Sequence, residues 1–134
     1  MGKRSSQLQT EPNLSPAQLE IMNLFWEHGE MGVAQVWKLL GERRSVARNT
    51  VQTMLTRLVE KGWLQARAEG NAHHFRASRA RRPALRGIVS QLLDSAFGGS
   101  ASGMVMALLE NRRLPADEAE RIRKMIDEAQ EGKK

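Results

Sequence analysis

Apolar residues recur at helical spacing in three successive segments of the first part of the chain. Ser15, Pro16 and Gln18 ahead of the first segment form an N-cap, a proline at the first helical position and the acceptor of a capping box. Glycines follow each segment and favour a stop. The predicted helices cover residues 16–28, 33–41 and, from Ala47 or Arg48, up to 61, with a turn at 28–32 between the first two.

A β-hairpin is predicted after the third helix. Residues 63–68 and 72–77 flank Glu69-Gly70-Asn71, and glycine and asparagine both tolerate the positive φ of a tight turn. Three helices followed by a hairpin is the order of a winged helix-turn-helix. The predicted fold class is therefore mainly α, with a winged helix-turn-helix of three helices and a β-hairpin wing ahead of a three-helix dimerisation region.

The spacing beyond residue 80 is helical again, with breaks at Gly98-Gly99-Ser100 and near Pro115. About 50 residues in three short helices bury too little surface to be stable alone. We therefore predict that this part pairs with a second copy of the chain, as a homodimer. The apolar positions expected in that dimer interface are Leu85, Ile88, Val89, Leu92, Leu93, Phe97, Val105, Leu108, Ile122 and Ile126.

These patterns divide the chain into four parts. The first carries Gly, Ser, Gln, Thr and Pro with one apolar residue, Leu8, after the initial Met, which is typical of a disordered arm. The predicted parts are a disordered N-terminal arm (1–13), a winged-helix DNA-binding domain (14–78), a helical dimerisation domain (79–130) and a flexible C-terminus (131–134).

Charge is distributed unevenly along the 134 residues. The 21 Lys and Arg against 15 Asp and Glu give a net charge of +6. Up to Arg82 the basic and acidic residues number 13 and 7, whereas from Pro83 onward they number 8 and 8. A basic first part favours a polyanionic partner, with nucleic acid ahead of an anionic membrane surface.

The third predicted helix presents a polar face opposite its apolar one. Amides, hydroxyls and guanidinium groups gather there, and no carboxylate precedes Glu60. Such groups bind base edges and phosphates, whereas a merely solvated face would mix Glu with Lys. We interpret this helix as a recognition helix for double-stranded DNA. Its expected contacts are Arg48, Asn49, Thr50, Gln52, Thr53, Thr56 and Arg57.

The hairpin is the second candidate for DNA contact. Arg67, His73 and Arg76 alternate along its strands and Asn71 lies near its tip, so we predict phosphate contacts from Arg67, Asn71 and His73. The alternative is an ordinary solvated hairpin that carries basic residues. The basic residues at 79, 81 and 82 are either phosphate contacts or a solvated hinge.

Other chemistry finds little support in the sequence. There is no cysteine, and adjacent His73 and His74 would point to opposite faces of a strand, so we expect no metal site. No catalytic grouping or phosphate-binding loop appears, and we expect neither an enzyme nor a cofactor. The three tryptophans, Trp26, Trp37 and Trp63, are interpreted as core residues.

Membrane insertion is not expected. The longest apolar run, Met104–Leu109, is far shorter than the roughly 18 residues of a spanning helix. No apolar export segment follows the polar N-terminus. We therefore expect a cytoplasmic protein.

Several segments resemble the penicillinase-repressor (BlaI/MecI) family of bacterial transcriptional regulators. They are Leu14–Met22 (LSPAQLEIM), Leu24-Phe25-Trp26 and, most specifically, Asn49–Leu64 (NTVQTMLTRLVEKGWL). Phe97-Gly98-Gly99-Ser100 resembles the family's dimerisation region, and the likeness extends from about Leu14 to Ala129.

The resemblance implies a homodimeric winged-helix repressor that binds palindromic operators with TACA/TGTA half-sites. It points to Thr50, Gln52, Thr53 and Arg57 as operator contacts. In some members repression is relieved by proteolysis in the C-terminal half, which implies a membrane-bound sensor protease as a partner.

This chain departs from the family pattern in four places. Ala47 replaces a helix-capping Ser, and Gln52 replaces an Arg, which favours adenine over guanine in the half-site. Ala107 and Leu108 stand where β-lactam-responsive members carry the cleaved Asn-Phe pair. The C-terminal cysteines of copper-responsive relatives are absent.

Two alternative functions remain open at this point. One is a winged-helix module that binds acidic protein surfaces, which the scarcity of acidic residues on the third helix disfavours. The other is a small-molecule-sensing winged-helix repressor with an effector pocket between the two halves, which the 4% content of aromatic residues disfavours.

Overall fold

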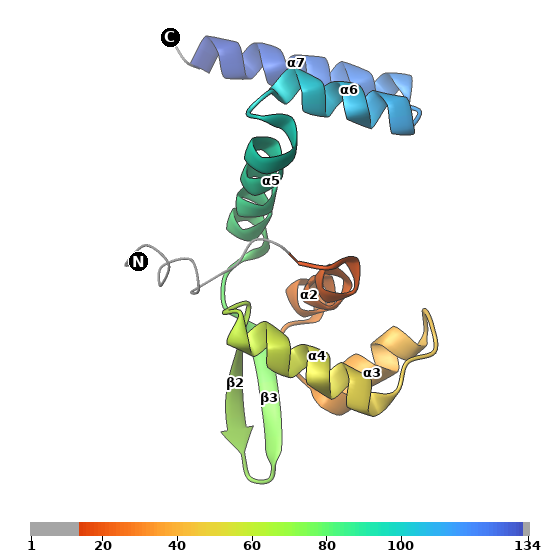
Figure 1. The fold of residues 1–134 in the computed structure, drawn as a ribbon, viewed down its shortest axis with the longest axis vertical. Helices are drawn as coiled ribbons and strands as arrows, with labels where there is room; N and C mark the ends of the chain where they lie inside the picture. Colours follow the sequence, from red (N-terminus) through yellow and green to blue (C-terminus); the bar gives the residue numbers. More distant parts are fainter. Residues whose placement is uncertain (1–13, 133–134) are drawn as a thin grey trace. The chain divides into compact units, whose positions relative to one another are not determined.

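The computed structural model describes residues 14–132. The predicted N-terminal arm and the last two residues of the predicted flexible C-terminus lie outside the described residues. Within them the elements follow in the order α2 (Pro16–His28), β1 (Met31–Gly32), α3 (Val33–Gly41), α4 (Arg48–Glu60), β2 (Leu64–Glu69), β3 (Ala72–Ala77), α5 (Arg81–Phe97), α6 (Ala101–Asn111) and α7 (Ala116–Gly132) (Figure 1).

The local signals at the start of the fold act as predicted. The Ser15 hydroxyl accepts a hydrogen bond from the Gln18 N–H at 3.1 Å, and the Gln18 side chain accepts one from the Ser15 N–H at 3.0 Å. This reciprocal capping box satisfies two of the N–H groups that a helix end leaves unpaired. α2 then ends at Gly29, whose φ of 84° suits glycine. The predicted helix over 16–28 is confirmed.

A short strand replaces part of the predicted turn at 28–32. Met31 and Gly32 pair with Phe75 and His74, so the sheet has three antiparallel strands in the order β1-β3-β2. The Met31 side chain is buried, which explains why the chain is held against β3 here. A strand of two residues leaves no periodic signal in the sequence, and the prediction of a hairpin alone was wrong in this respect.

The hairpin itself is confirmed, with one correction at its turn. β2 and β3 pair from Leu64 opposite Ala77 to Glu69 opposite Ala72, leaving Gly70 and Asn71 as the connection. Gly70 has a φ of 61°, while no non-glycine residue among the described ones has a positive φ. Only the glycine therefore needs its conformational freedom in this turn.

One apolar core joins the first three helices to the sheet. α4 packs against α3 and β2, and α2 packs against α3 and β3 (Figure 1). All residues buried in the described part of the chain are apolar: Ile21, Met22, Leu24, Phe25, Met31, Val36, Leu40, Val51, Leu55, Leu58, Trp63, Leu64, Phe75 and Ala84. This arrangement confirms the predicted winged-helix fold class.

The chain divides into a first unit that ends at Gln91 and a second unit that begins at Leu92. The predicted boundary at residues 78 and 79 differs from this division because the start of α5 belongs to the core of the first unit. Ala84 is buried in that core and Ile88 packs against it. The division therefore falls inside a continuous helix.

The second unit contains the end of α5 together with α6 and α7, and no residue of α6 or α7 is buried. The Ser100 hydroxyl caps α6 by accepting a hydrogen bond from the Gly103 N–H at 2.9 Å. α7 continues to Gly132, so residues 131 and 132 are helical rather than part of a flexible end. Ile122 and Ile126 share one face of this amphipathic helix, at i, i+4 spacing.

No single helix within residues 14–132 is long and apolar enough to cross a membrane. Only α5 and α6 taken together reach the necessary length and hydropathy, and a bend of 94° separates them.

Candidate nucleic-acid interface

α4 has one apolar and one polar face. Val51, Leu55 and Leu58 are buried against the core, which leaves the opposite side of the helix exposed. All the residues that the sequence assigned to DNA contact on this helix are exposed: Arg48, Asn49, Thr50, Gln52, Thr53, Thr56 and Arg57. No acidic residue occurs in the first turn. The exposed face therefore offers amide, hydroxyl and guanidinium groups without a carboxylate before Glu60.

The donors on this face differ in how free they are. The Thr56 hydroxyl donates to the Gln52 carbonyl at 3.0 Å, within the helix, so only its lone pairs remain available. Within the described part of the chain, no carboxylate forms an ion pair with Arg48 or Arg57. Arg48 and Arg57 therefore keep guanidinium groups that an anionic partner would find unneutralised.

A cleft of about 350 Å³ lies between the start of α4 and the wing. Arg48 and Gln52 line it from the helix, and Asn71 and His73 line it from the hairpin. Four of the predicted contacts, which lie up to 25 residues apart in sequence, therefore border one concave surface. The cleft is open to an elongated ligand that carries hydrogen-bond acceptors along its edge.

Arg67 lies on the other face of the hairpin from His73. In the antiparallel register Arg67 is opposite His74, whereas His73 is opposite Ala68. Side chains alternate between faces along a strand, so Arg67 and Arg76 share one face and His73 is on the other. Phosphate contact by Arg67, Asn71 and His73 stays a prediction, and the register places Arg67 and His73 on opposite faces of the hairpin.

Two carboxylates already hold the Arg67 guanidinium. Its Nε and Nη2 donate to the two Glu30 oxygens at 3.1 and 3.0 Å, and its Nη1 lies 3.3 Å from Glu69 Oε1. The hydrogen bonds from Arg67 lower the pKa of Glu30 below its ordinary value, and those to Glu30 raise the pKa of Arg67. A phosphate at Arg67 would have to compete with these bonds.

Trp37 is 40% exposed, so its assignment to the core was wrong. Val36 and Leu40 occupy the buried face of α3 and leave Trp37 on its outer side. By contrast, Trp63 is buried, and Trp26 is half-buried with its Nε1 donating to the Arg79 carbonyl at 3.0 Å. Helical spacing did not exclude Trp37 from the core, because it lies four residues after Val33 and so fits the apolar repeat of Val33, Val36 and Leu40.

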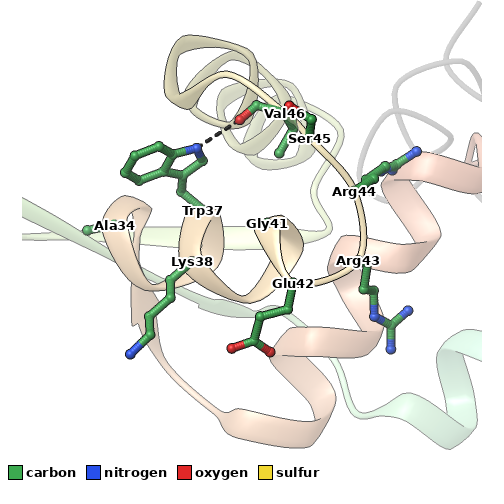
Figure 2. Close-up of a pocket in the computed structure, with 9 residues that line it drawn as sticks. All are labelled: Ala34, Trp37, Lys38, Gly41, Glu42, Arg43, Arg44, Ser45 and Val46. Atoms are coloured by element: carbon green, nitrogen blue, oxygen red, sulfur yellow. Dashed lines mark hydrogen bonds between the residues drawn. The ribbon is translucent and has the colours of Figure 1, made fainter.

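An open groove of about 780 Å³ follows the outer side of α3 and the loop that leads to α4 (Figure 2). Trp37 forms one wall and Val46 lies across from it, joined by a hydrogen bond from the indole Nε1 to the Val46 carbonyl. The residues lining this groove are Ala34, Trp37, Lys38, Gly41, Glu42, Arg43, Arg44, Ser45 and Val46. Both arginines also form ion pairs with Glu20 of α2.

The predicted dimer-interface residues fall into two groups. Val89, Leu92, Val105, Leu108 and Ile126 are among the large apolar side chains that remain exposed. The other five are partly buried, and Ile88 packs on the core of the first unit. Three further exposed apolar residues were not predicted, namely Met106, Leu109 and Met125. The sequence feature that could have identified these three residues is the apolar character of α6 around most of its circumference and the row of apolar residues along one side of α7.

No cluster of three or more potential metal ligands occurs among residues 14–132. His74 lies 3.2 Å from Glu69, and both His73 and His74 line the cleft between α4 and the wing. Their side chains alternate between the faces of β3 in the strand register.

A three-helix core, a small antiparallel sheet with a protruding hairpin and an outward polar helix define a winged-helix protein of the DNA-binding class. The penicillinase repressor family model matches residues 14–128. The chain therefore belongs to the penicillinase repressor family, which confirms the resemblance seen in the sequence. This is a family of transcriptional regulators, which is not an enzyme class.

Two relatives match over most of their length. The penicillinase repressor of Bacillus licheniformis is 28% identical over 123 residues, which cover 92% of this chain and 96% of that protein. The transcriptional regulator BlaI of Mycobacterium tuberculosis is 30% identical over 114 residues, which cover 84% of this chain and 81% of that protein.

Solved structures share the fold. The solution structure of the DNA-binding domain of the repressor BlaI is 32% identical, with a TM-score of 0.50, and the match covers 55% of this chain and 89% of that domain. RosR of H. salinarum matches 90% of this chain and 96% of its own with a TM-score of 0.51. Its 15% identity limits that likeness to the fold.

Proposed function

We propose that this repressor acts as a homodimer on a palindromic operator, with α4 as its recognition helix. The observation that carries the proposal is the fully exposed polar face of α4, which bears no carboxylate before Glu60. Gln52 and Asn49 offer amides for adenine edges, and Arg48 and Arg57 offer guanidinium groups for phosphate or guanine. The matched BlaI domain, described as DNA-binding, supports DNA as the partner of this fold.

The wing takes a secondary part in this proposal. Asn71 and His73 border the cleft that Arg48 and Gln52 line, so one strand of the duplex backbone would run between helix and hairpin. Arg67 contributes little to this interface, because Glu30 and Glu69 hold its guanidinium and offset its charge.

The homodimer is proposed from the second unit. Leu92, Val105 and Leu108 are each about half exposed, at 47%, 51% and 48%. Apolar surface of this kind on a small helical unit favours pairing with a like surface. A two-fold axis would then set two copies of α4 in successive major grooves about one DNA turn apart, which requires a palindromic operator. TACA/TGTA-like half-sites follow from the family resemblance.

Relief of repression by proteolysis, with a membrane-bound sensor protease, stays a prediction from the resemblance. The matching positions, Ala107 and Leu108, lie inside α6, where the helical backbone would have to unwind before a protease could bind it. A cytoplasmic location follows from the proposed action on DNA.

Selection of duplexes from random DNA tests the proposal directly. The full chain should enrich a two-fold symmetric consensus, and its affinity should fall steeply between about 50 and 200 mM salt because bound phosphates release counterions. A consensus without two-fold symmetry, or affinity that ignores salt, would contradict the proposal.

A substitution of Gln52 then tests whether this residue contacts base edges and so contributes to sequence specificity. Gln52→Ala should reduce the preference for the selected duplex over random DNA by ~1–3 kcal/mol, since it removes a base-edge contact. Gln130→Ala, an exposed glutamine on α7, is the matched control and should leave the preference unchanged. An unchanged preference in Gln52→Ala would remove this residue from the proposed reading surface.

A further inference from the structure

The recognition helix begins without the side-chain cap that helices usually carry. Ala47 is the N-cap, in an extended conformation, and no side chain accepts a hydrogen bond from the first turn. Ser, Thr, Asp and Asn are preferred at this position because their oxygens satisfy the free N–H groups. α2 and α6 in the same chain do have such caps, from Ser15 and Ser100. The start of α4, like that of α3 with Gly32 as its N-cap, therefore lacks this stabilisation.

Trp37 of α3 contacts the chain beside the Ala47 N-cap. Its indole Nε1 donates to the carbonyl of Val46, the residue before the N-cap, at 2.8 Å (Figure 2). The guanidinium carbon of Arg48, the first helical residue, lies 6.0 Å from the centre of the same ring. One side chain thus contacts the chain on both sides of Ala47, which fixes the path by which the loop enters the helix.

The exposure of Trp37 argues against a role in core packing alone. It is 40% exposed, while Val36 and Leu40 fill the buried side of α3. A cation above an aromatic face is attracted to it, and a flat ring limits the rotamers open to the arginine. Arg48 borders the cleft between α4 and the wing, so its orientation bears on whatever enters that cleft.

We propose that Trp37 is a positioning residue for operator recognition, which holds the loop that enters α4 and the Arg48 guanidinium at a helix start that has no side-chain cap. This inference rests on the proposed function. Trp37 itself need not touch DNA, because it acts through the Val46 carbonyl and Arg48.

Binding of the full-length chain to the duplex selected by the wild type tests the inference. Trp37→Leu removes the hydrogen bond and the ring and should weaken binding about three- to tenfold, the range expected for loss of a helix cap. Trp37→Phe keeps a ring and should have a smaller effect. Trp26→Phe is the matched control, since it removes another indole bond to a carbonyl, and should change affinity less than about twofold.

Rescue by a cap gives the sharpest readout. Ala47→Ser should supply the missing oxygen and restore part of the affinity lost in Trp37→Leu. A purely structural loss elsewhere in α3 would not respond to this change. Wild-type affinity in Trp37→Leu, an equal loss in Trp26→Phe, or the absence of any rescue would each overturn the inference.

Amide hydrogen exchange in the free protein keeps this test separate from the proposed function. The amides from Val51 to Met54, whose helical acceptors are the carbonyls of residues 47–50, should exchange about three- to tenfold faster in Trp37→Leu than in the wild type, and Ala47→Ser should slow them again. If the wild-type protein enriched no duplex from random DNA, the proposed function would be contradicted. The hydrogen-exchange rates would still test whether Trp37 stabilises the start of α4. Unchanged exchange in Trp37→Leu would overturn the inference whatever the DNA result.

Discussion

The first unit buries most of its large apolar side chains, with Trp37 and Val89 as exposed exceptions, whereas the second unit buries none of its own among the described residues. All the buried residues found in the described chain lie at or before Ala84, and α6 and α7 bury none. Charge shows the opposite contrast, because the basic excess ends at Arg82 and the later residues are balanced. The first unit therefore has an apolar core of its own and carries the basic excess, while the second unit carries exposed apolar surface.

This difference is the reason for proposing a different partner for each unit. An exposed polar face without carboxylates suits a polyanion, and half-exposed Val, Leu and Ile suit a second protein surface. Marginal cores are expected for units of this size, and pairing is one of the ways in which small helical units reach stability. The predictions that follow apply matched changes to the two units.

The largest effect is expected for removal of a buried leucine. Leu55→Ala should lower the free energy of unfolding by ~2–5 kcal/mol, because it leaves a cavity in the core of the first unit. Leu108→Ala, where the side chain is 48% exposed, should lower it by less than ~1 kcal/mol in dilute protein. Denaturant unfolding measures both. Equal losses would contradict the contrast between a closed core and an open surface.

The next effect tests what the apolar surface of the second unit is for. Leu92→Asp should raise the dissociation constant of the proposed homodimer at least about a hundredfold, or ~2.7 kcal/mol, because a charge would be buried without a partner. Ser90→Asp adds the same charge at an exposed polar position of α5 and is the control. Analytical ultracentrifugation that found an intact dimer in Leu92→Asp would show that this face is not the interface.

A smaller effect is expected for charge on the first unit. Arg57→Ala should weaken binding to the selected duplex about tenfold at low salt and reduce the salt dependence by about one phosphate contact. Arg67→Ala should weaken it less, because Glu30 and Glu69 already bind that guanidinium. Arg121→Ala on α7 serves as the control. Fluorescence anisotropy at several salt concentrations measures the affinity of each variant for the duplex. Equal losses of affinity in all three variants would mean that only the net charge of the protein matters.

The smallest effect concerns the ion pair behind the wing. The pKa of Glu30 is lowered in the folded protein, chiefly by hydrogen bonds from Arg67, so the stability that the pair contributes is present above the unfolded pKa of about 4.3. It is lost as the pH falls through the lower folded pKa. Glu30→Gln should therefore reduce the melting temperature slightly at pH 7, and the difference from wild type should vanish in acid. Arg67→Gln should behave alike, and a difference that grew in acid would contradict this account.

Local patterns determined much of this protein from the sequence alone. The Ser15 capping box, the helical spacing, the β-hairpin and the polar face of α4 depend on residues within a few positions of one another. Each was predictable because helix and strand periodicities act over that range. The Asn49–Leu64 segment also carried the resemblance to the family that the comparisons confirm.

Contacts between distant residues were decided only by the tertiary structure. β1 exists because Met31 pairs with Phe75, and the register of β2 and β3 separates Arg67 from His73. The indole of Trp37 reaches across the loop to Val46, and Ile88 joins the core of the first unit. Each depends on how preformed elements pack together, and that packing leaves no periodic trace in the residues nearby.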